Sequence, residues 1–294
     1  MAPMRDPHFF VLDGGGTSCR AALHGMNGQE LGRATGDFAN LTSDFAASCH
    51  HIEDIIRATY GAAGLEPGTS SGDVAILGVA GAEFGDAAAR LQSRLPFASA
   101  EVLSDRQISI AGILGDTDGT LAQIGTGSFF VSRTGDRQIE AGGWGLVLGD
   151  ECSGAWLGRE ALRAALRAHD RLDKATDLTR QVLVAHGDDA KALVLHAAAA
   201  TPQDFARLAP DIFAAATAGD GCAMAILARA IGDLEHILHA ITGGADQPLY
   251  LCGGVGVHYA PMLAPEWRAR LAAPQGDGLS GALTLAHALW HRSI

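Results

Sequence analysis

Lysine is scarce in this sequence: there are only two, Lys174 and Lys191, and neither follows a glycine. The phosphate-binding loop of the form Gly-x-x-x-x-Gly-Lys-Ser/Thr is therefore absent, and so is the strand lysine of protein kinases. No Gly-x-Gly-x-x-Gly run lies at a strand-to-helix junction, which excludes the dinucleotide motif. If this chain binds a nucleotide, it must do so with backbone N–H groups and a metal ion rather than with a lysine.

Positive charge is also in short supply overall, because 21 Lys and Arg residues face 33 Asp and Glu residues, a formal net charge of −12. A negative surface repels phosphate backbones and anionic lipids, so we expect neither nucleic acid nor a membrane surface as a partner. No stretch approaches 18 uninterrupted apolar residues, which predicts no membrane span. The segment Met1 to Phe10 lacks a basic flank followed by an apolar run, so no signal peptide is expected.

The cysteines form no Cys-x-x-Cys pair and are widely spaced, at Cys19, Cys49, Cys152, Cys222 and Cys252. This spacing argues against a disulfide framework and against a thiolate zinc site. It favours a reducing, cytoplasmic location in which the cysteines are small buried side chains.

What the sequence does contain is a repeated pattern of strands and glycine-rich loops. An apolar run ends at Asp13–Thr17 (Asp-Gly-Gly-Gly-Thr), and a second strand and a tight turn follow it. From Gly119 the pattern recurs, with a strand that ends in Gly125–Ser128 (Gly-Thr-Gly-Ser) and continues into a further strand and turn. Two copies of one supersecondary unit predict an α/β protein of two related lobes.

The remaining segments complete these lobes. A helix is expected to start near Thr42–Asp44 and to stop near Gly61, and apolar strands are expected at 74–79, 101–103 and 248–251. The second half is mainly helical, with helices at 153–168, within 202–241 and at 280–290. We expect an N-terminal lobe of residues 1–117, onto which the C-terminal helix 280–294 packs, and a C-terminal lobe of residues 118–279.

The glycine loops are suited to phosphate binding. Glycines let the backbone approach an anion closely and let successive N–H groups point at it. Thr17 and Thr126 each add a hydroxyl, and the carboxylate of Asp13 could hold a hydrated Mg²⁺, since hard cations prefer oxygen ligands. One such loop is more often an ordinary hairpin. Two after strands, with a third glycine pair at Gly253-Gly254, favour a nucleotide site.

Together these motifs resemble a known family. Asp13–Thr17, Asp105, Gly125–Ser128, the run from Gly142 to Glu151 (Gly-Gly-Trp-Gly, then Gly-Asp-Glu) and Cys252–Val255 occur in the order typical of the BadF/BadG/BcrA/BcrD-type ATPases. Within that family the chain looks like the N-acetylglucosamine kinase and glucosamine kinase branch, and the similarity runs from about Phe9 to about Leu289.

The resemblance implies an actin-like ATPase fold, which is ribonuclease H-like: duplicated lobes with mixed sheets flanked by helices, and a ligand cleft between the lobes. It implies the cofactors ATP and Mg²⁺, an amino sugar as partner and a homodimer. The residues it places at the nucleotide are backbone positions of the glycine loops, namely Gly14, Gly15, Gly16, Thr17, Gly125, Thr126, Gly127, Gly253 and Gly254. Those it places at the sugar are Asn40, Asp105, Ser128, Gly143, Trp144, Gly145 and Asp150.

Asp105 is the predicted catalytic base, because it follows a strand and a carboxylate there can accept the proton of the attacking sugar hydroxyl. The alternative is that Asp105 caps a helix beginning at Arg106. Asp150 likewise has an alternative role, in a turn leading into a cap at Ser153. Two departures from the family pattern bear on the site. Arg106 follows the acid and is expected to hold it ionised, and Cys152 replaces a usual glycine, which would narrow the sugar pocket if it faces inward.

The predicted function is therefore an ATP-dependent kinase acting on the 6-hydroxyl of N-acetylglucosamine or glucosamine. One alternative, from another branch of the family, is an ATP-driven activator of a 2-hydroxyacyl-CoA dehydratase, which needs cysteine ligands for an iron–sulfur cluster. A second alternative is a non-catalytic sugar-sensing protein on the same fold.

Overall fold

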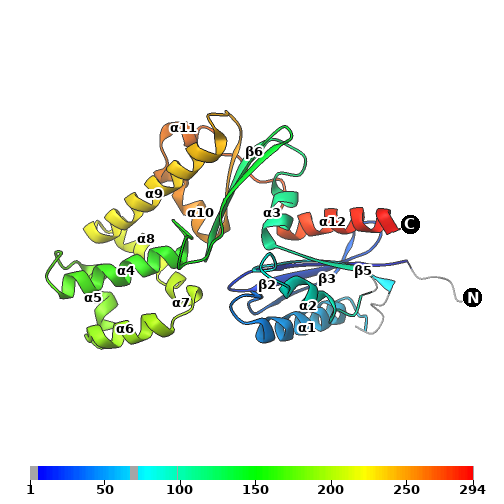
Figure 1. The fold of residues 1–294 in the computed structure, drawn as a ribbon, viewed down its shortest axis with the longest axis horizontal. Helices are drawn as coiled ribbons and strands as arrows, with labels where there is room; N and C mark the ends of the chain where they lie inside the picture. Colours follow the sequence, from blue (N-terminus) through cyan, green and yellow to red (C-terminus); the bar gives the residue numbers. More distant parts are fainter. Residues whose placement is uncertain (1–5, 67–71, 98, 294) are drawn as a thin grey trace, which may run out of the picture. The chain divides into compact units, whose positions relative to one another are not determined.

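The computed structural model describes residues 6–66, 72–97 and 99–293. The chain forms two compact units (Figure 1). Unit 1 comprises Met1–Asp116 and Pro274–Ile294, and unit 2 comprises Thr117–Ala273. The sequence predicted lobe boundaries at 117/118 and 279/280. That the two lobes are separate domains stays a prediction.

Unit 1 is built on a five-stranded sheet in the order β3-β2-β1-β4-β5. Its strands are β1 (Phe9–Gly14), β2 (Cys19–His24), β3 (Glu30–Gly36), β4 (Val74–Val79) and β5 (Ser99–Leu103). β1, β2 and β3 pair antiparallel, whereas β4 and β5 run parallel to β1. The sheet is therefore mixed, and β1 is its central strand.

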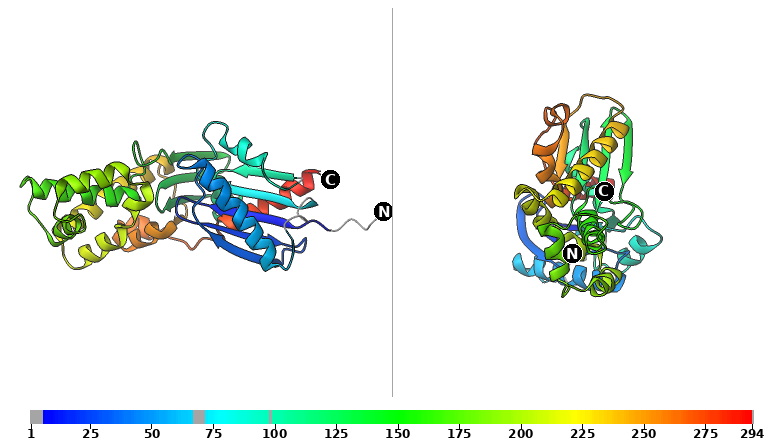
Figure 2. Two further views of the ribbon diagram at one scale, coloured as in Figure 1. Left: turned by 90° about the horizontal axis from the view of Figure 1, so that it is seen from below. Right: turned by 90° about the vertical axis from the view of Figure 1, so that its left-hand side faces the viewer.

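Helices cover both faces of this sheet, as Figures 1 and 2 show. They are α1 (Phe45–Ala62), α2 (Ala87–Gln92), α3 (Asp105–Ile113) and α12 (Gly278–Ser293). Successive side chains of β1 point to opposite faces. Phe10 and Leu12 pack in the core under α1, whereas Phe9 and Val11 pack in the core under α3 and α12. By the same alternation, Asp13 lies on the face covered by α12.

Unit 2 has a four-stranded sheet in the order β8-β7-β6-β9. Its strands are β6 (Gly119–Ile124), β7 (Ser128–Thr134), β8 (Arg137–Gly142) and β9 (Leu249–Cys252). Its helices are α4 (Gly154–His169), α5 (Asp177–Val184), α6 (Ala190–Ala199), α7 (Pro202–Ala206), α8 (Ala209–Thr217), α9 (Gly221–Thr242), α10 (Gly253–Tyr259) and α11 (Pro265–Arg268), with a 3₁₀ turn at Ala260–Met262. They pack with β6 and β9 around one hydrophobic core.

The two sheets repeat one arrangement. In each, three antiparallel strands are joined by tight turns, and a later strand pairs parallel with the first of them, β4 with β1 and β9 with β6. The predicted duplication is therefore confirmed, although the sequences of the two copies differ.

Several predicted elements agree with the structure and a few ends differ. β4 spans the predicted residues 74–79, and α1 follows an N-cap at Asp44, whose side chain accepts a hydrogen bond from the backbone of Ala47. The expected stop at Gly61 is wrong by one residue, because α1 continues to Ala62. Ser153 caps α4 as expected, accepting from the Trp156 backbone N–H.

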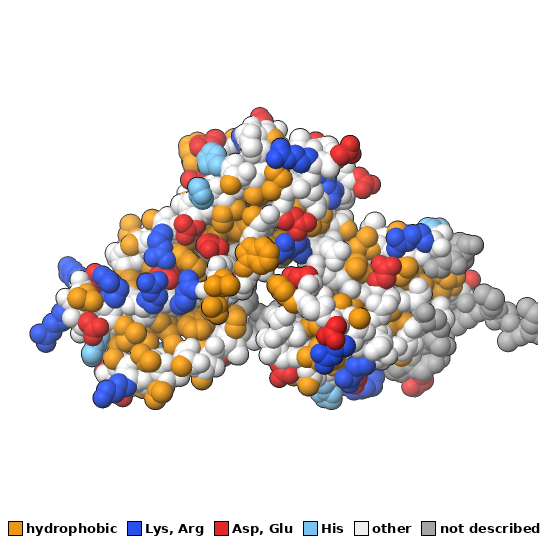
Figure 3. All heavy atoms as spheres, viewed as in Figure 1, with side chains coloured by type: hydrophobic (Ala, Val, Ile, Leu, Met, Phe, Trp, Pro, Cys, Tyr) orange, Lys and Arg blue, Asp and Glu red, His pale blue; other side chains and the backbone are white. Residues whose placement is uncertain are grey.

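Within the described ranges, no single helix is long and apolar enough to cross a membrane, whereas the bent pair Pro202–Thr217 and Gly221–Thr242, at 112°, qualifies by length and composition only. Hydrophobic side chains gather on the surface of unit 2 over α5 and α6 (Figure 3). On α6, Val194 and Leu195 are 50% and 72% exposed.

Helices α3 and α12 approach each other closely through glycines. A Cβ placed on Gly281 of α12 would overlap the carbonyl oxygen of Ile108, and a Cβ on Gly112 of α3 would overlap that of Asp277. The two helices therefore pack backbone against backbone, and this contact sets the position of the first turn of α12 relative to α3.

We predict that Gly281→Ala lowers the free energy of unfolding of the protein by about 2 kcal/mol, because the added methyl must push the helices apart. In Gly61→Ala, also in a helix of unit 1, the methyl meets nothing within 4 Å. There, helix propensity favours alanine by up to about 1 kcal/mol. Urea unfolding of both variants checks this pair, and equal stability of the two would contradict the proposed packing.

Candidate active site

In unit 1 the candidate residues follow three parallel strands at one edge of the sheet. The carboxyl ends of such strands are where open α/β sheets bind ligands. The glycine loop follows β1, the segment Ala80–Asp86 follows β4, and Ser104-Asp105 follows β5. Because β1, β4 and β5 are adjacent and parallel, these three segments meet at the same edge.

Backbone hydrogen bonds link the glycine loop to the segment that carries Asn40. The Ala80 N–H donates to the Gly14 carbonyl (2.8 Å), and the Leu41 N–H donates to the Ala80 carbonyl (2.9 Å). The Ala39 N–H donates to the Gly15 carbonyl (2.9 Å). Gly14 is required here, because a Cβ on it would lie 2.8 Å from the Cβ of Ala39. The structure thus places Asn40 beside the predicted phosphate loop, whose Thr17 is exposed.

The side chain of Asn40 has a defined orientation. Its Oδ1 accepts from the Thr42 N–H (3.0 Å), the Thr42 hydroxyl (2.8 Å) and the Ser43 N–H (3.1 Å). The Nδ2 group lies toward Gly16, 4.0 Å from where a Cβ on that glycine would be. Asn40 therefore presents hydrogen-bond donors to the loop region, which suits a sugar hydroxyl or a phosphate oxygen.

Asp105 is the first residue of α3 rather than its cap. Ser104 is the N-cap, and its hydroxyl accepts from the Gln107 N–H (3.3 Å) while the Gln107 side chain accepts from the Ser104 N–H (3.0 Å). The alternative that Asp105 caps this helix is therefore wrong. The Asp105 carboxylate accepts only from the adjacent Arg106 backbone N–H (2.9 Å) among the interactions of the described residues.

The charge environment of Asp105 is unfavourable to its ionised form. Burial, with the nearby charges of Glu83 and Asp13, raises the pKa of Asp105 from 3.8 to about 7. The backbone N–H and the charge of Arg106 lower this pKa but are outweighed, so the expectation that Arg106 holds the carboxylate ionised is wrong. Its charge is outweighed by desolvation and by two negative neighbours.

In unit 2, the loop after β6 lies against the start of α4. The Gly154 N–H donates to the Gly125 carbonyl (2.8 Å), and the Ala155 N–H donates to the Thr126 carbonyl (3.1 Å). Gly253 lies against the end of β6, because a Cβ on it would overlap the carbonyl oxygen of Ile124. Its φ of +83° also favours glycine. The structure therefore brings together the glycine loops at 125–127 and 253–254, as a shared nucleotide site requires.

The predicted sugar contacts of unit 2 form one network. The Ser128 hydroxyl donates to the Glu151 carbonyl (2.8 Å), and the Gly143 N–H donates to the Ser128 carbonyl (2.8 Å). Asp150 is buried, and its Oδ1 lies 3.5 Å from the Ser128 N–H. Burial raises the pKa of Asp150, while hydrogen bonds from the Ser128 and Gly145 backbones oppose the shift. Trp144, between two glycines of positive φ, is 68% exposed. The Ser153 N–H donates to the Asp150 carbonyl (3.1 Å), so Asp150 does belong to the turn that leads into the cap of α4. Its contact with the sugar stays a prediction.

Cys152 does not narrow a pocket. Its side chain is fully buried in the hydrophobic core of unit 2, and its carbonyl accepts from the Tyr259 hydroxyl (2.6 Å). Its φ is +58°, a left-handed conformation that favours glycine. A glycine would adopt this backbone conformation without strain.

Three residues near the candidate site were missed from the sequence. Arg20 pairs with Asp13 across the first hairpin, Asp277 binds the same guanidinium, and the charge of Glu83 raises the pKa of Asp105. Arg20 could have been found from the hairpin register, because it lies directly opposite Asp13. The other two lie on segments distant in sequence.

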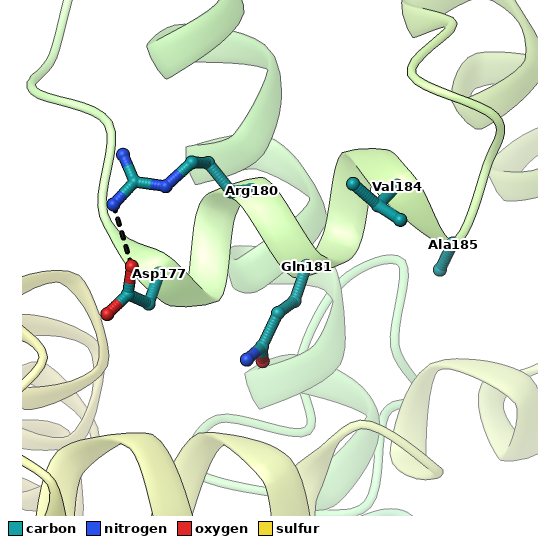
Figure 4. A pocket seen from close by; sticks show the side chains of 5 residues that line it. All are labelled: Asp177, Arg180, Gln181, Val184 and Ala185. Atoms are coloured by element: carbon teal, nitrogen blue, oxygen red, sulfur yellow. Dashed lines mark hydrogen bonds and ion pairs between the residues drawn. The ribbon is translucent and has the colours of Figure 1, made fainter.

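A separate hollow lies on α5, lined by Asp177, Arg180, Gln181, Val184 and Ala185 (Figure 4). Asp177 and Arg180 form an ion pair across it at 2.7 Å. None of the predicted site residues lines this hollow, so it is not the candidate active site.

Comparison with known proteins agrees with this arrangement. The model of the BadF/BadG/BcrA/BcrD ATPase family matches residues 12–262, and the chain belongs to that family. It is 29% identical to a glucosamine kinase of Vibrio cholerae over 280 residues, 95% of each chain. It is 28% identical to the N-acetyl-D-glucosamine kinase of Dictyostelium discoideum over 275 residues, 84% of each chain.

Among solved structures, the chain resembles a candidate N-acetylglucosamine kinase of Chromobacterium violaceum, with 36% identity and a TM-score of 0.88 over 95% of this chain and 99% of the other. The predicted actin-like fold class is thereby confirmed.

The raised pKa of Asp105 predicts a pH-dependent cost to stability. From about pH 4 to about pH 7 the folded state keeps a proton that the unfolded state releases, so stability falls as pH rises and the loss is complete above about pH 7. Asp105→Asn lacks this titration. We expect the variant to be more stable than the wild type by on the order of 2 kcal/mol above about pH 8, with a smaller gain at about pH 5.

Urea unfolding at the two pH values measures this difference. A gain that is the same at both, or a loss at the higher pH, would show that Asp105 is not a buried carboxylate of raised pKa.

Proposed function

We propose that this protein is an ATP-dependent kinase that transfers the γ-phosphoryl group to the 6-hydroxyl of an amino sugar, glucosamine or N-acetylglucosamine. Membership of the ATPase family and similarity to two curated amino-sugar kinases support the reaction class. The observation that carries the proposal is Asp105, a carboxylate with a pKa of about 7 at the same sheet edge as a glycine loop suited to phosphate.

Asp105 is the proposed general base. A base works best when its pKa is near the working pH, because enough of it is ionised and it still binds a proton well. In the reaction, Asp105 accepts the proton of the 6-hydroxyl while the sugar oxygen forms a bond to the γ-phosphorus. The bond between that phosphorus and the β–γ bridging oxygen breaks, and ADP leaves with the electron pair.

The glycine loops supply the phosphate contacts. Backbone N–H groups of Gly16–Thr17 and Thr126–Gly127 would donate to the phosphate oxygens, and the Thr17 and Thr126 hydroxyls would add to them. The Gly15 and Gly125 N–H groups instead close the turns by donating to the Ser18 and Gly127 carbonyls. Gly253 and Gly254 would lie along the adenosine. These donors carry no formal charge, which is consistent with a chain that has only two lysines.

A magnesium ion fits the residues present at Asp13. Asp13 is the penultimate residue of β1, beside the glycine loop, and carboxylate with water is the ligand set that Mg²⁺ prefers. Magnesium held there through water supplies charge neutralisation to the triphosphate. Asn40, Ser128, Gly143–Gly145 and Asp150 would orient the sugar hydroxyls.

The dehydratase-activator alternative has less support. It needs clustered cysteine ligands, but Cys152 is fully buried in the core of unit 2 and burial raises its pKa well above the usual value.

The proposed reaction is tested by ADP release from ATP and Mg²⁺ with glucosamine, N-acetylglucosamine and glucose. We expect one amino sugar to stimulate release strongly, and Asp105→Asn to lower its turnover by about 10²–10⁴-fold while ADP still binds. The 6-deoxy form of the preferred sugar should compete with it without being phosphorylated. A phosphorylated 6-deoxy sugar among the products would rule out the 6-hydroxyl as acceptor, and wild-type turnover in the Asn variant would remove Asp105 from the reaction.

The pH profile tests the base separately. We expect kcat/KM for the sugar to fall about tenfold per pH unit below about pH 7, where Asp105 becomes protonated. Glu83→Gln removes a negative neighbour, so the pKa of Asp105 and the acid limb should move to lower pH. Glu53→Gln, on α1, serves as the control. An acid limb that stays in place in Glu83→Gln would contradict the assignment.

A further inference from the structure

Arg20 occupies a defined position between two carboxylates of unit 1. It lies on β2 directly opposite Asp13 of β1. Its Nη2 donates to Asp13 Oδ2 at 2.6 Å, and its Nη1 donates to Asp277 Oδ2 at 3.1 Å. A planar guanidinium holds two acceptors in fixed directions, so this one side chain orients both carboxylates.

The Oδ1 atoms of Asp13 and Asp277 differ in their hydrogen bonding. Asp277 Oδ1 accepts from the Ser280 N–H at 3.1 Å, in the first turn of α12, so both oxygens of Asp277 are used. Among the interactions of the described residues, Asp13 Oδ1 accepts no hydrogen bond. The same carboxylate lies against Gly278, where a Cβ would be 2.8 Å from Asp13 Oδ2. Asp13 is thus held on one side and has one oxygen available.

A carboxylate in this position needs such support. The terminal torsion of an aspartate side chain is broad, so its two oxygens are not oriented by the rotamer alone. The hydrogen bond from the Arg20 guanidinium to Asp13 Oδ2 supplies that orientation.

We infer that Arg20 is a positioning residue for the magnesium–nucleotide site: by tying Asp13 Oδ2 to the start of α12, it directs Asp13 Oδ1 toward the metal's water. This inference rests on the proposed function. It assigns Arg20 no contact with nucleotide or sugar. Partners that orient metal-site ligands in this way are commonly worth 10–100-fold in metal affinity.

A purely structural ion pair would have a different signature. Exposed ion pairs contribute little to folding stability, so a change in the Mg²⁺ dependence of ADP binding would not follow from the loss of such a pair alone. Arg33 and Glu30, on the neighbouring strand β3, form such a pair at 2.6 Å, with side chains 50% and 39% exposed. Arg33→Gln is therefore a matched control for Arg20→Gln, since each removes one guanidinium from an ion pair in the same sheet.

The test measures ADP binding by calorimetry across a range of MgCl₂ concentrations and in EDTA. We expect Arg20→Gln to raise the Mg²⁺ concentration for half-maximal enhancement of ADP binding by about tenfold, with ADP affinity in EDTA unchanged. Arg33→Gln should match the wild type in both. Arg20→Lys keeps the charge but lacks the planar guanidinium that holds two carboxylates in fixed directions. We therefore expect the Mg²⁺ concentration that it requires to rise by at least about threefold.

Each other outcome overturns the inference. An unchanged or lower Mg²⁺ requirement in Arg20→Gln would show that Arg20 does not support the metal site. Equal weakening of ADP binding with and without Mg²⁺ would show that Arg20 contacts the nucleotide itself. If Arg20→Gln gives no cooperative thermal transition, Arg20→Lys decides by the same criteria. A wild-type protein that binds no ADP at any Mg²⁺ concentration would instead refute the proposed function, and the inference with it.

Discussion

The hydrogen-bond ladders on the two sides of β1 determine where the candidate residues of unit 1 lie. The antiparallel ladder with β2 places Arg20 opposite Asp13, and the parallel ladder with β4 brings the β4–α2 loop to the same edge as the glycine loop. The Ala80 backbone extends this pairing to the segment of Asn40. A shift of β1 by one residue would turn Asp13 to the face covered by α1, among the apolar residues of that core.

The site that results is one of concentrated negative charge at a buried edge. Asp13, Asp105 and Glu83 lie near one another, and the pKa values of the first two are raised. Such an arrangement opposes folding at neutral pH, since ionised carboxylates are desolvated beside like charges. It is well suited to a proton acceptor and to a hydrated cation. The buried carboxylates therefore lower the stability of the fold, and the proposed chemistry uses the unusual pKa that results.

The two units use the same supersecondary arrangement for different purposes. In unit 1 the loop after the first strand is accompanied by carboxylates with incomplete hydrogen bonding. In unit 2 the corresponding loop is held by the start of α4, and the polar side chains of Ser128 and Asp150 are directed at neighbouring backbone. Duplication explains the shared geometry, whereas the proposed chemistry depends on side chains of one copy. Cys152 adopts a positive φ of 58° although it is not glycine.

Features that depend on neighbouring residues were determined by the sequence alone: the apolar period of the strands, the glycine loops that end them, and the helix start at Asp44. Backbone sterics and capping act over a few residues, so they can be inferred without a fold. Tertiary structure alone decided the pKa of Asp105, the burial of Cys152 and the contact of Arg20 with a carboxylate 257 residues away. Desolvation and long-range ion pairing depend on which distant segments surround a group, and only the packed chain specifies them.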